Sequence, residues 1–231
     1  MKKQTILILL LIMTMTISLV GCKKKDIGVD NETEVEVTTV PTATPPPATP
    51  TLVPTPVPEN HDGETQSKLT GLWVPEEIGN KRPYAIMFNN IKLASPQSGT
   101  SEADILYEAI VEGGITRLMG IFEVLNDTRI GSARSARHYF VSFADEYDAI
   151  FVHFGETTYA TKKIKALGIN NLSGLTGIGE ILFYRDKSIN APHNAFATKD
   201  GILKGTEIKG YETEYDKEYE GHFSLDQKSV V

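Results

Sequence analysis

The sequence predicts an α/β domain in which a mixed sheet contains a β-hairpin and packs against helices. Short apolar runs at 84–88 and 149–154 have the length of buried strands. Apolar residues recur at helical spacing in 136–147, and a second helix is predicted over 157–167. Two alternating runs flank Gly113-Gly114, and paired glycines favour a tight two-residue hairpin turn. Strands alternating with helices around a hairpin indicate a layered α/β architecture.

The first 21 residues have the form of a secretory signal peptide. Lys2 and Lys3 precede an apolar run from Ile6 to Val20, which is too short for a full membrane span. The last four residues, Leu19-Val20-Gly21-Cys22, resemble the bacterial lipobox, which implies cleavage before Cys22 and a lipid on its thiol. We therefore expect an exported protein, held by this lipid at the outer face of the bacterial cytoplasmic membrane. An uncleaved anchor helix is the alternative.

Composition excludes several kinds of partner. Cys22 is the only cysteine, so the domain must be stable without an intrachain disulfide. Removal of residues 1–21 takes away two lysines and leaves 21 basic against 30 acidic residues, a formal charge of −9. This balance argues against a nucleic-acid partner and against electrostatic binding of the domain to anionic lipid. Membrane attachment should depend on the lipid at Cys22.

Residues 22–68 are expected to form a disordered linker that begins at the lipidated cysteine. The stretch from Thr38 to Pro58 holds eight of the twelve prolines and seven threonines. Such a composition cannot bury a core and favours extended polyproline geometry. We interpret the stretch as a spacer that lifts the domain from the membrane. A ligand tract for a proline-binding partner and a glycosylated stalk are the alternatives.

The folded domain is predicted over residues 69–205. Thr157 or Thr158 starts the helix at 157–167, and Gly168 ends it. A glycine-rich loop at 173–180 and a short strand within 191–198 follow, and a turn of helix is expected at 199–204. Residues 206–231 are expected to be a tail or the start of a C-terminal domain, which would make the chain truncated.

The expected hairpin register gathers the charged residues on one face. If Gly113 and Gly114 form the turn, Ile110 faces Arg117, and Arg117 lies within reach of both Glu108 and Glu112. The opposite face is then apolar and should pack on the core. Its members are Ile105, Tyr107, Ala109, Val111, Leu118 and Phe122.

The domain closely resembles the YerB-like bacterial lipoproteins in three runs: PQSGTSEADILYEAIVEGGITRLMGIF, IGSARSARHYFVSFADEYDAIFVHFG and FYRDKSINAPHNAFAT. The resemblance covers roughly Arg82 to Lys204. That family is built on a domain of unknown function, and its members generally continue into a second domain, of which this chain would hold only the beginning. The resemblance implies a lipid-anchored envelope protein and supplies no established catalytic residues.

A loop rich in arginine and small residues is the first candidate site. Arg129, Arg134 and Arg137 lie in it beside Ser132 and Ser135, and a helix begins directly after it. Guanidinium groups bind carboxylate or phosphate through paired hydrogen bonds. The predicted ligand-binding residues are Arg117, Arg134, Arg137, Asn89, Gln97 and His193. The alternative is structural pairing of the arginines with Glu102, Asp104, Glu108 and Glu112.

Catalytic signatures are weak. His153 or His193, with Glu108 or Glu112, are the weak candidates for acid–base catalysis. The sequence has no HExxH or GxSxG motif, and the glycine-rich loop lacks a P-loop lysine, so neither a metal nor a cofactor is expected.

The leading hypothesis is therefore a non-enzymatic, lipid-anchored binding or scaffold protein of the bacterial cell envelope. It would recognise an anionic wall component or an envelope partner protein. The alternative is a cell-wall-directed hydrolase or transferase that uses histidine and carboxylate side chains.

Overall fold

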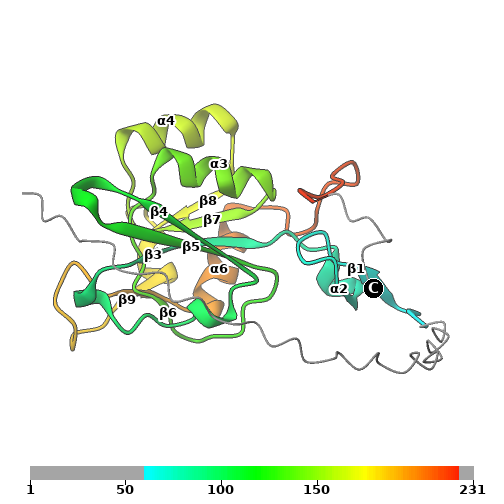
Figure 1. The fold of residues 1–231 in the computed structure, drawn as a ribbon, viewed down its shortest axis with the longest axis horizontal. Helices are drawn as coiled ribbons and strands as arrows, with labels where there is room; N and C mark the ends of the chain where they lie inside the picture. The colour runs from blue at the N-terminus through cyan, green and yellow to red at the C-terminus, as the bar shows by residue number, and fades with distance from the viewer. Residues whose placement is uncertain (1–59, 224–231) are drawn as a thin grey trace, which may run out of the picture. The chain divides into compact units, whose positions relative to one another are not determined.

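A five-stranded mixed sheet forms the centre of the computed structural model, which describes residues 60–223 (Figure 1). Cys22, the signal peptide and the proline-rich stretch lie outside these residues. Neighbouring strands are antiparallel across β4-β5-β3 and parallel across β3-β7-β8, which confirms the predicted mixed α/β sheet. The strands, in sheet order, are β4 (Ile105–Ile110), β5 (Thr116–Phe122), β3 (Tyr84–Asn89), β7 (Ile150–His153) and β8 (Asn171–Ser173).

Both faces of the sheet are covered, as Figure 1 shows. Helices α3 (His138–Glu146) and α4 (Thr158–Leu167) lie on one face, where Phe140 packs with Met87 and Phe151. A second, antiparallel sheet and two helices lie on the other face. These elements are β6 (Ile130–Gly131), β10 (Ala195–Ala197), β9 (Phe183–Arg185), α5 (Gly179–Leu182) and α6 (Lys199–Lys209). Strand β3 is buried along its whole length, which explains why its sequence is continuously apolar and does not alternate with polar residues.

The hairpin exists, but the predicted register is wrong by one residue. Glu112 joins both glycines in a three-residue loop, closed by a hydrogen bond from Val111 N–H to Ile115 O of 2.8 Å. Arg117 therefore lies opposite Ala109 and not Ile110. Because successive strand residues alternate between faces, this shift moves the β5 side chains to the opposite side of the sheet from the predicted one.

The corrected register changes which residues share the core faces. Met119 and Ile121 pack under helix α3, together with Tyr107 of β4. Leu118 and Phe122, predicted on that face, instead contact the core beneath β6 and α6. Strand β5 is consequently buried on both faces, and the Arg117 side chain lies on the face that α3 and α4 cover.

Helix ends follow the local signals closely. Thr157 Oγ1 accepts a hydrogen bond from Ala160 N–H at 3.2 Å, and Gly168 ends α4 in the left-handed conformation, with φ of 70°. Helix α6 extends to Lys209, beyond both the predicted helix end and the boundary drawn at 205. Within residues 60–223, none of the helices combines the length and the apolar character that a membrane crossing requires.

The predicted linker range extends too far. Strand β1 (Glu64–Gln66) pairs antiparallel with β2 (Trp73–Pro75), and the short helix α2 (Glu76–Gly79) follows. Ser67, which falls within the linker predicted over residues 22–68, is also buried. Three-residue 3-10 turns at Lys92–Ala94 and Thr100–Glu102 complete the connection from β3 to β4.

Candidate functional site

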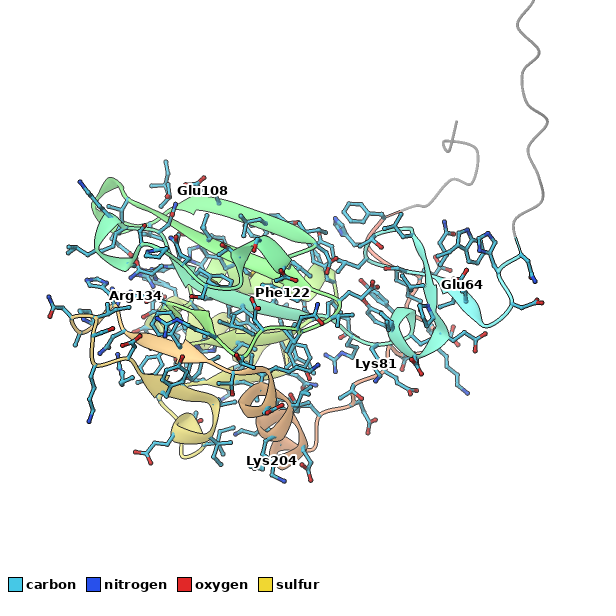
Figure 2. The ribbon with its side chains drawn as sticks, turned by 90° about the horizontal axis from the view of Figure 1, so that it is seen from below. Glu64, Lys81, Glu108, Phe122, Arg134 and Lys204 are labelled. Carbon is cyan, nitrogen blue, oxygen red and sulfur yellow. The ribbon has the colours of Figure 1, made fainter. Side chains whose placement is uncertain are left out.

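The candidate site lies where the carboxyl ends of the parallel strands meet, an edge at which α/β folds commonly bind ligands. Strand β3 ends there at Asn89, β7 at His153 and β8 at Ser173. The loop from β6 to α3, residues 132–137, crosses the same edge. In Figure 2, Arg134 of this loop is labelled at one end of the domain, and Glu64 of β1 is labelled at the other.

Backbone hydrogen bonds fix this loop between two strands that diverge. Arg134 N–H donates to Met87 O at 3.2 Å, and Arg134 O accepts from Phe154 N–H at 3.0 Å. Ala133 packs into the core, so its neighbours Ser132 and Arg134 project to the opposite side of the extended loop. The loop thus holds a guanidinium group on a backbone that is bonded on both sides.

Two further arginines meet at one carbonyl group. Arg117 Nη1 donates to Ser135 O at 2.5 Å, and Arg137 Nη1 donates to the same oxygen at 3.2 Å. Arg137 also forms an ion pair with Glu112, with 2.6 Å between Nη2 and Oε2. The Arg137 hydrogen bond lowers the pKa of Glu112 to about 2, so this carboxylate is charged at all ordinary pH values.

Arg117 is buried without a carboxylate partner. Its side chain is 4% exposed, and its Nε makes no hydrogen bond, as is also true of Arg134 Nε and Ser132 Oγ. Among residues 60–223, neither Arg117 nor Arg134 has a carboxylate within ion-pair distance. Burial, with the charges of Arg137 and Arg134, lowers the pKa of Arg117 to about 10, which leaves it charged at neutral pH.

The polar residues predicted at the rim lie beside this cluster. Asn89 Nδ2 donates to His193 Nδ1 at 2.8 Å, and Gln97 Nε2 donates to Asn89 O at 2.9 Å. The neutral imidazole therefore carries its proton on Nε2, which is left to donate elsewhere. Burial and the charge of Arg134 lower the pKa of His193 and favour this neutral form. We call Arg117, Arg134, Arg137, Asn89, Ser132 and His193 the arginine site.

Other predicted partners lie elsewhere. Glu108 contacts Asn90 and Thr116, and Asp104 accepts a hydrogen bond from the backbone of Glu123. Arg129 pairs with Asp186 at 2.8 Å. The predicted structural pairing of the arginines with four carboxylates is therefore observed only between Arg137 and Glu112.

One neighbour of the arginine site was not predicted. Burial lowers the pKa of Arg134, and the charges of Arg137 and of Arg185 in β9 add to this effect, so Arg185 lies near Arg134. It is placed there by the antiparallel pairing of β9 with β10, in which Arg185 lies opposite Ala195. In the sequence, only the closeness of Arg185 to His193 along the chain pointed to this position, because the pairing of β9 with β10 cannot be predicted from the residues of β9 alone.

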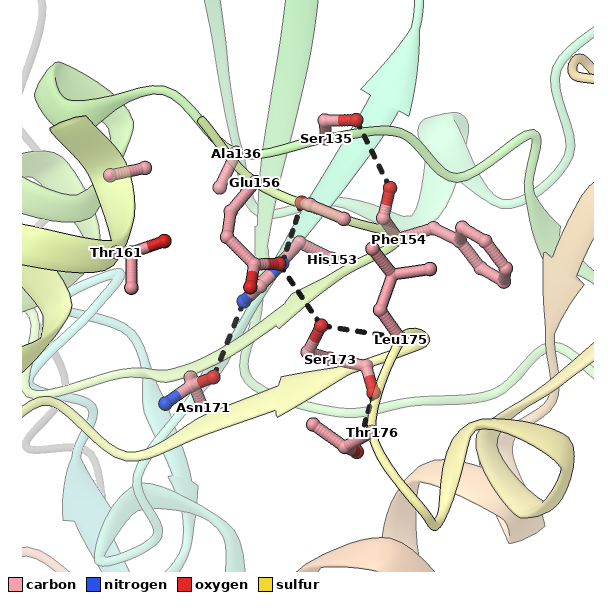
Figure 3. Close-up of polar contacts among 12 residues, drawn as sticks. Ser135, Ala136, His153, Phe154, Glu156, Thr161, Asn171, Ser173, Leu175 and Thr176 are labelled. Carbon is pink, nitrogen blue, oxygen red and sulfur yellow. Dashed lines mark hydrogen bonds and ion pairs between the residues drawn. The ribbon is translucent and has the colours of Figure 1, made fainter. Parts of the chain in front are cut away.

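His153 lies in an enclosed polar network (Figure 3). Its side chain is 0% exposed, and its Nδ1 donates a hydrogen bond to Gly155 O at 2.8 Å. Glu156 Oε2 lies 3.4 Å from the same nitrogen. Glu156 in turn accepts a hydrogen bond from Ser173 Oγ at 3.1 Å, while Asn171 Oδ1 lies 3.4 Å from Nε2. The network joins the ends of β7 and β8, which gives His153 a structural role.

This network predicts a loss of stability in mild acid. Burial lowers the pKa of His153 in the folded state. The unfolded chain takes up a proton near pH 6.5, so below that pH it binds more protons than the folded state. Between pH 6.5 and the folded-state pKa, the free energy of unfolding should fall by up to about 1.4 kcal/mol per pH unit as pH decreases.

Urea unfolding of the full chain and of His153→Gln between pH 5 and 7.5 measures this effect. The variant should show a shallower pH slope, whatever its absolute stability. Equal slopes for the two proteins would contradict the prediction, because the proton uptake would then belong to other groups, such as His193.

A pocket of about 570 Å³ opens beside the arginine site. We call it the loop pocket, because the segment from Gly174 to Glu180 forms one of its walls. The opposite wall comes from Phe154 and from the residues around β9. Phe154 belongs to this wall and its N–H donates to Arg134 O at 3.0 Å, so the loop pocket and the arginine site adjoin.

A second pocket, of about 330 Å³, lies at the other end of β3, where Tyr84 and Arg82 contribute to its wall. There Arg82 is fully engaged, with Nε 3.0 Å from Asp148 Oδ2 and Nη1 donating to Glu212 O at 2.9 Å. The described part of the chain contains no cluster of three or more histidine, cysteine and acidic side chains able to hold a metal ion. The arginine site therefore remains the best-supported candidate.

Comparisons with known proteins identify relatives of the domain. A family model described as protein of unknown function (DUF3048) N-terminal domain matches residues 69–212. The putative lipoprotein YerB of Bacillus subtilis (strain 168) is 40% identical over 146 residues, which are 63% of this chain and 44% of that protein. The crystal structure of YerB protein from Bacillus subtilis matches with a TM-score of 0.60 and 37% identity, over 66% of this chain and 52% of that one. The chain thus spans about half the length of these relatives.

Proposed function

This chain belongs to the family described as protein of unknown function (DUF3048) N-terminal domain, and from that premise we propose that its domain is a lipid-anchored, anion-binding module of the bacterial cell envelope. The similar protein of Bacillus subtilis is named as a putative lipoprotein. The lipobox-like residues 19–22 and the apolar run before them support the same anchor in this chain. The domain would then act at the outer face of the cytoplasmic membrane.

The buried guanidinium group of Arg117 carries the proposal. Burying a charge is costly unless it is paired and hydrogen-bonded, yet Arg117 has one carbonyl partner and an unused Nε. Arg134 and Arg137 lie close enough that their charges lower its pKa further. Three arginines thus face one carboxylate, that of Glu112, in a chain whose formal charge is −7. A bound phosphate or carboxylate would supply the missing acceptors.

Binding is better supported than catalysis. A cell-wall-directed hydrolase or transferase would need a histidine beside a carboxylate at an accessible position. His153 is enclosed, Glu108 is engaged by Thr116 and Asn90, and Glu112 is engaged by Arg137. Of the two candidate histidines, His193 is the accessible one, and its Nδ1 accepts from Asn89, so it is arranged as a hydrogen-bond donor to a ligand. We therefore propose recognition of an anionic wall component, with an acidic segment of a partner protein as the second candidate.

Arg134→Gln tests the proposal, because the Arg134 side chain has no carboxylate to lose. Titration calorimetry of the full chain in detergent, with inorganic phosphate at low salt, should show binding that the variant weakens at least about tenfold. Lys165→Gln removes the same charge from the exposed surface of α4 and serves as the matched control. Absence of phosphate binding to the unaltered chain, or equal losses in both variants, would contradict the proposal.

A further inference from the structure

We infer that the ligand carries an uncharged, polyhydroxylated ring next to its anionic group, and that the loop pocket binds this ring. The inference rests on the proposed function and extends it from the charge of the ligand to its chemical class. Glycosyl phosphates and acidic sugars belong to this class. Four features of the loop pocket support the inference.

First, Arg185 connects the two parts of the site. It lines the loop pocket together with Phe154, whose backbone N–H donates to Arg134 O at 3.0 Å. Its position is fixed, because Nη1 donates to Asn194 Oδ1 at 2.8 Å and the guanidinium lies 4.4 Å from the ring centroid of Phe154. A ligand whose anion contacts Arg134 therefore lies next to the wall of the loop pocket that Phe154 and Arg185 form.

Second, the loop pocket presents apolar surface to solvent. Leu175 is 68% exposed and Tyr184 is 40% exposed, and both belong to its walls. Phe154 and Phe183, packed edge-to-face at 5.2 Å, form the aromatic side. Phe183 is only 6% exposed and the Arg185 guanidinium covers the Phe154 ring, so the exposed ring of Tyr184 offers the ligand an apolar face with a hydroxyl at its edge.

Third, polar groups are spaced among these apolar walls. The hydroxyl groups of Thr176 and Tyr184 and the carboxylate of Glu180 belong to the same pocket. Glu180 would accept hydrogen bonds from ligand hydroxyls and would repel a second anionic group. Thr176 Oγ1 already donates to Ser173 O at 2.8 Å and the Tyr184 hydroxyl accepts from Arg129 Nη1 at 3.2 Å, so Glu180 is the group that a plain hydrocarbon chain would desolvate without pairing. The part of the ligand in the loop pocket is therefore neutral and bears hydroxyl groups.

Fourth, a glycine leaves the space open. A Cβ atom added at Gly177 would meet nothing within 4 Å, and the backbone there is outside the left-handed region. Gly174 and Gly179 differ, because a Cβ at either position would collide with neighbouring atoms. Gly177→Phe therefore places a side chain in the loop pocket without backbone strain, while the arginine site is left intact.

Calorimetric titration of the full chain in detergent, with inorganic phosphate and with glucose 1-phosphate, tests the inference. The unaltered chain should bind glucose 1-phosphate at least tenfold more tightly than phosphate. Gly177→Phe should remove this advantage and leave phosphate affinity unchanged, whereas Gly177→Ala should retain most of it. Glu180→Gln, at an exposed position, should reduce glucose 1-phosphate affinity several-fold, which keeps the test decisive should Gly177→Phe fold poorly.

The outcomes separate the inference from the proposed function. Equal affinity for the two probes, or an undiminished preference in both Gly177→Phe and Glu180→Gln, would overturn the inference while the arginine site stands. Tighter binding of hexyl phosphate than of glucose 1-phosphate would overturn it in favour of an apolar ligand. Failure of the unaltered chain to bind either phosphate compound would overturn the proposed function itself.

Discussion

Arg117→Met is expected to weaken anion binding about a hundredfold, because each charge-assisted hydrogen bond to a bound anion contributes about 1.5–3 kcal/mol and Arg117 can offer more than one. The same substitution should leave the free energy of unfolding within about 1 kcal/mol of its present value. A large loss of binding without a loss of stability is the behaviour of a residue kept for function.

The expected stability follows from what the substitution removes and restores. It removes one hydrogen bond to Ser135 O, worth about 1 kcal/mol, although Arg137 continues to donate to that oxygen. It also removes a buried charge whose pKa is lowered by burial and by two neighbouring guanidinium groups. Methionine retains an unbranched apolar stem on the same face of β5 as Met119. Urea unfolding of both proteins, with phosphate affinity measured alongside, tests the prediction.

Arg82→Met is the matched control. Arg82 is also buried, at 8% exposure, but it is paired with Asp148 and donates to Glu212 O. The substitution leaves the partly buried carboxylate of Asp148 without its partner, and the free energy of unfolding is expected to fall by about 3 kcal/mol. If Arg117→Met destabilised the domain as much as Arg82→Met, Arg117 would be a structural residue, and the anion-binding interpretation would lose its main support.

Local chemistry made most of the fold predictable. The apolar run at Tyr84–Phe88 indicated a buried strand, and Thr157 with Gly168 marked both ends of α4. Strand β8 was missed because its three residues, Asn171–Ser173, include two polar ones whose partners come from the β7 network. Helix α5 was missed because its sequence lies in the glycine-rich segment.

The members of the arginine site remain a prediction, and their pairings could be described only from the structure. The arginines of the loop at 132–137 were recognisable in the sequence. In the structure Asn89 lies opposite Arg117, and its hydrogen bonds connect it with Gln97 and His193. Arg117 was placed beside Glu108 because a two-residue turn was assumed, and one additional loop residue moved it to the other face of the hairpin. Hairpin register and the approach of β9 depend on contacts between distant segments, which spacing alone does not reveal.

Histidine roles also required the three-dimensional structure. His153 lies two residues after Phe151 on β7, so both side chains point to the face covered by α3 and α4. The partners of His153 come from the segment after β7 and from β8. The sequence shows only a histidine near a strand end, which is equally compatible with catalysis and with a buried hydrogen-bonded residue. Enclosure by Gly155, Glu156 and Asn171 favours the second interpretation.

The glycine-rich loop at 173–180 yields the second prediction of large effect. Gly179→Ala is expected to lower the free energy of unfolding by about 3 kcal/mol. A Cβ atom there would lie 2.3 Å from Gly174 O, a backbone atom that cannot move without displacing the loop. The midpoint of thermal unfolding should fall by about 6 to 12 °C.

Gly177→Ala is the internal control, since its Cβ would meet nothing within 4 Å, and its stability should change by less than about 0.5 kcal/mol. Equal stabilities of the two variants would contradict the packing explanation. The contrast assigns different causes to neighbouring glycines. Gly179 permits close contact with Gly174 and so holds the loop in its folded shape, whereas Gly177 leaves the adjoining pocket open. Gly179→Ala should therefore also weaken glucose 1-phosphate binding, while inorganic phosphate, held by the arginine site, should bind as before.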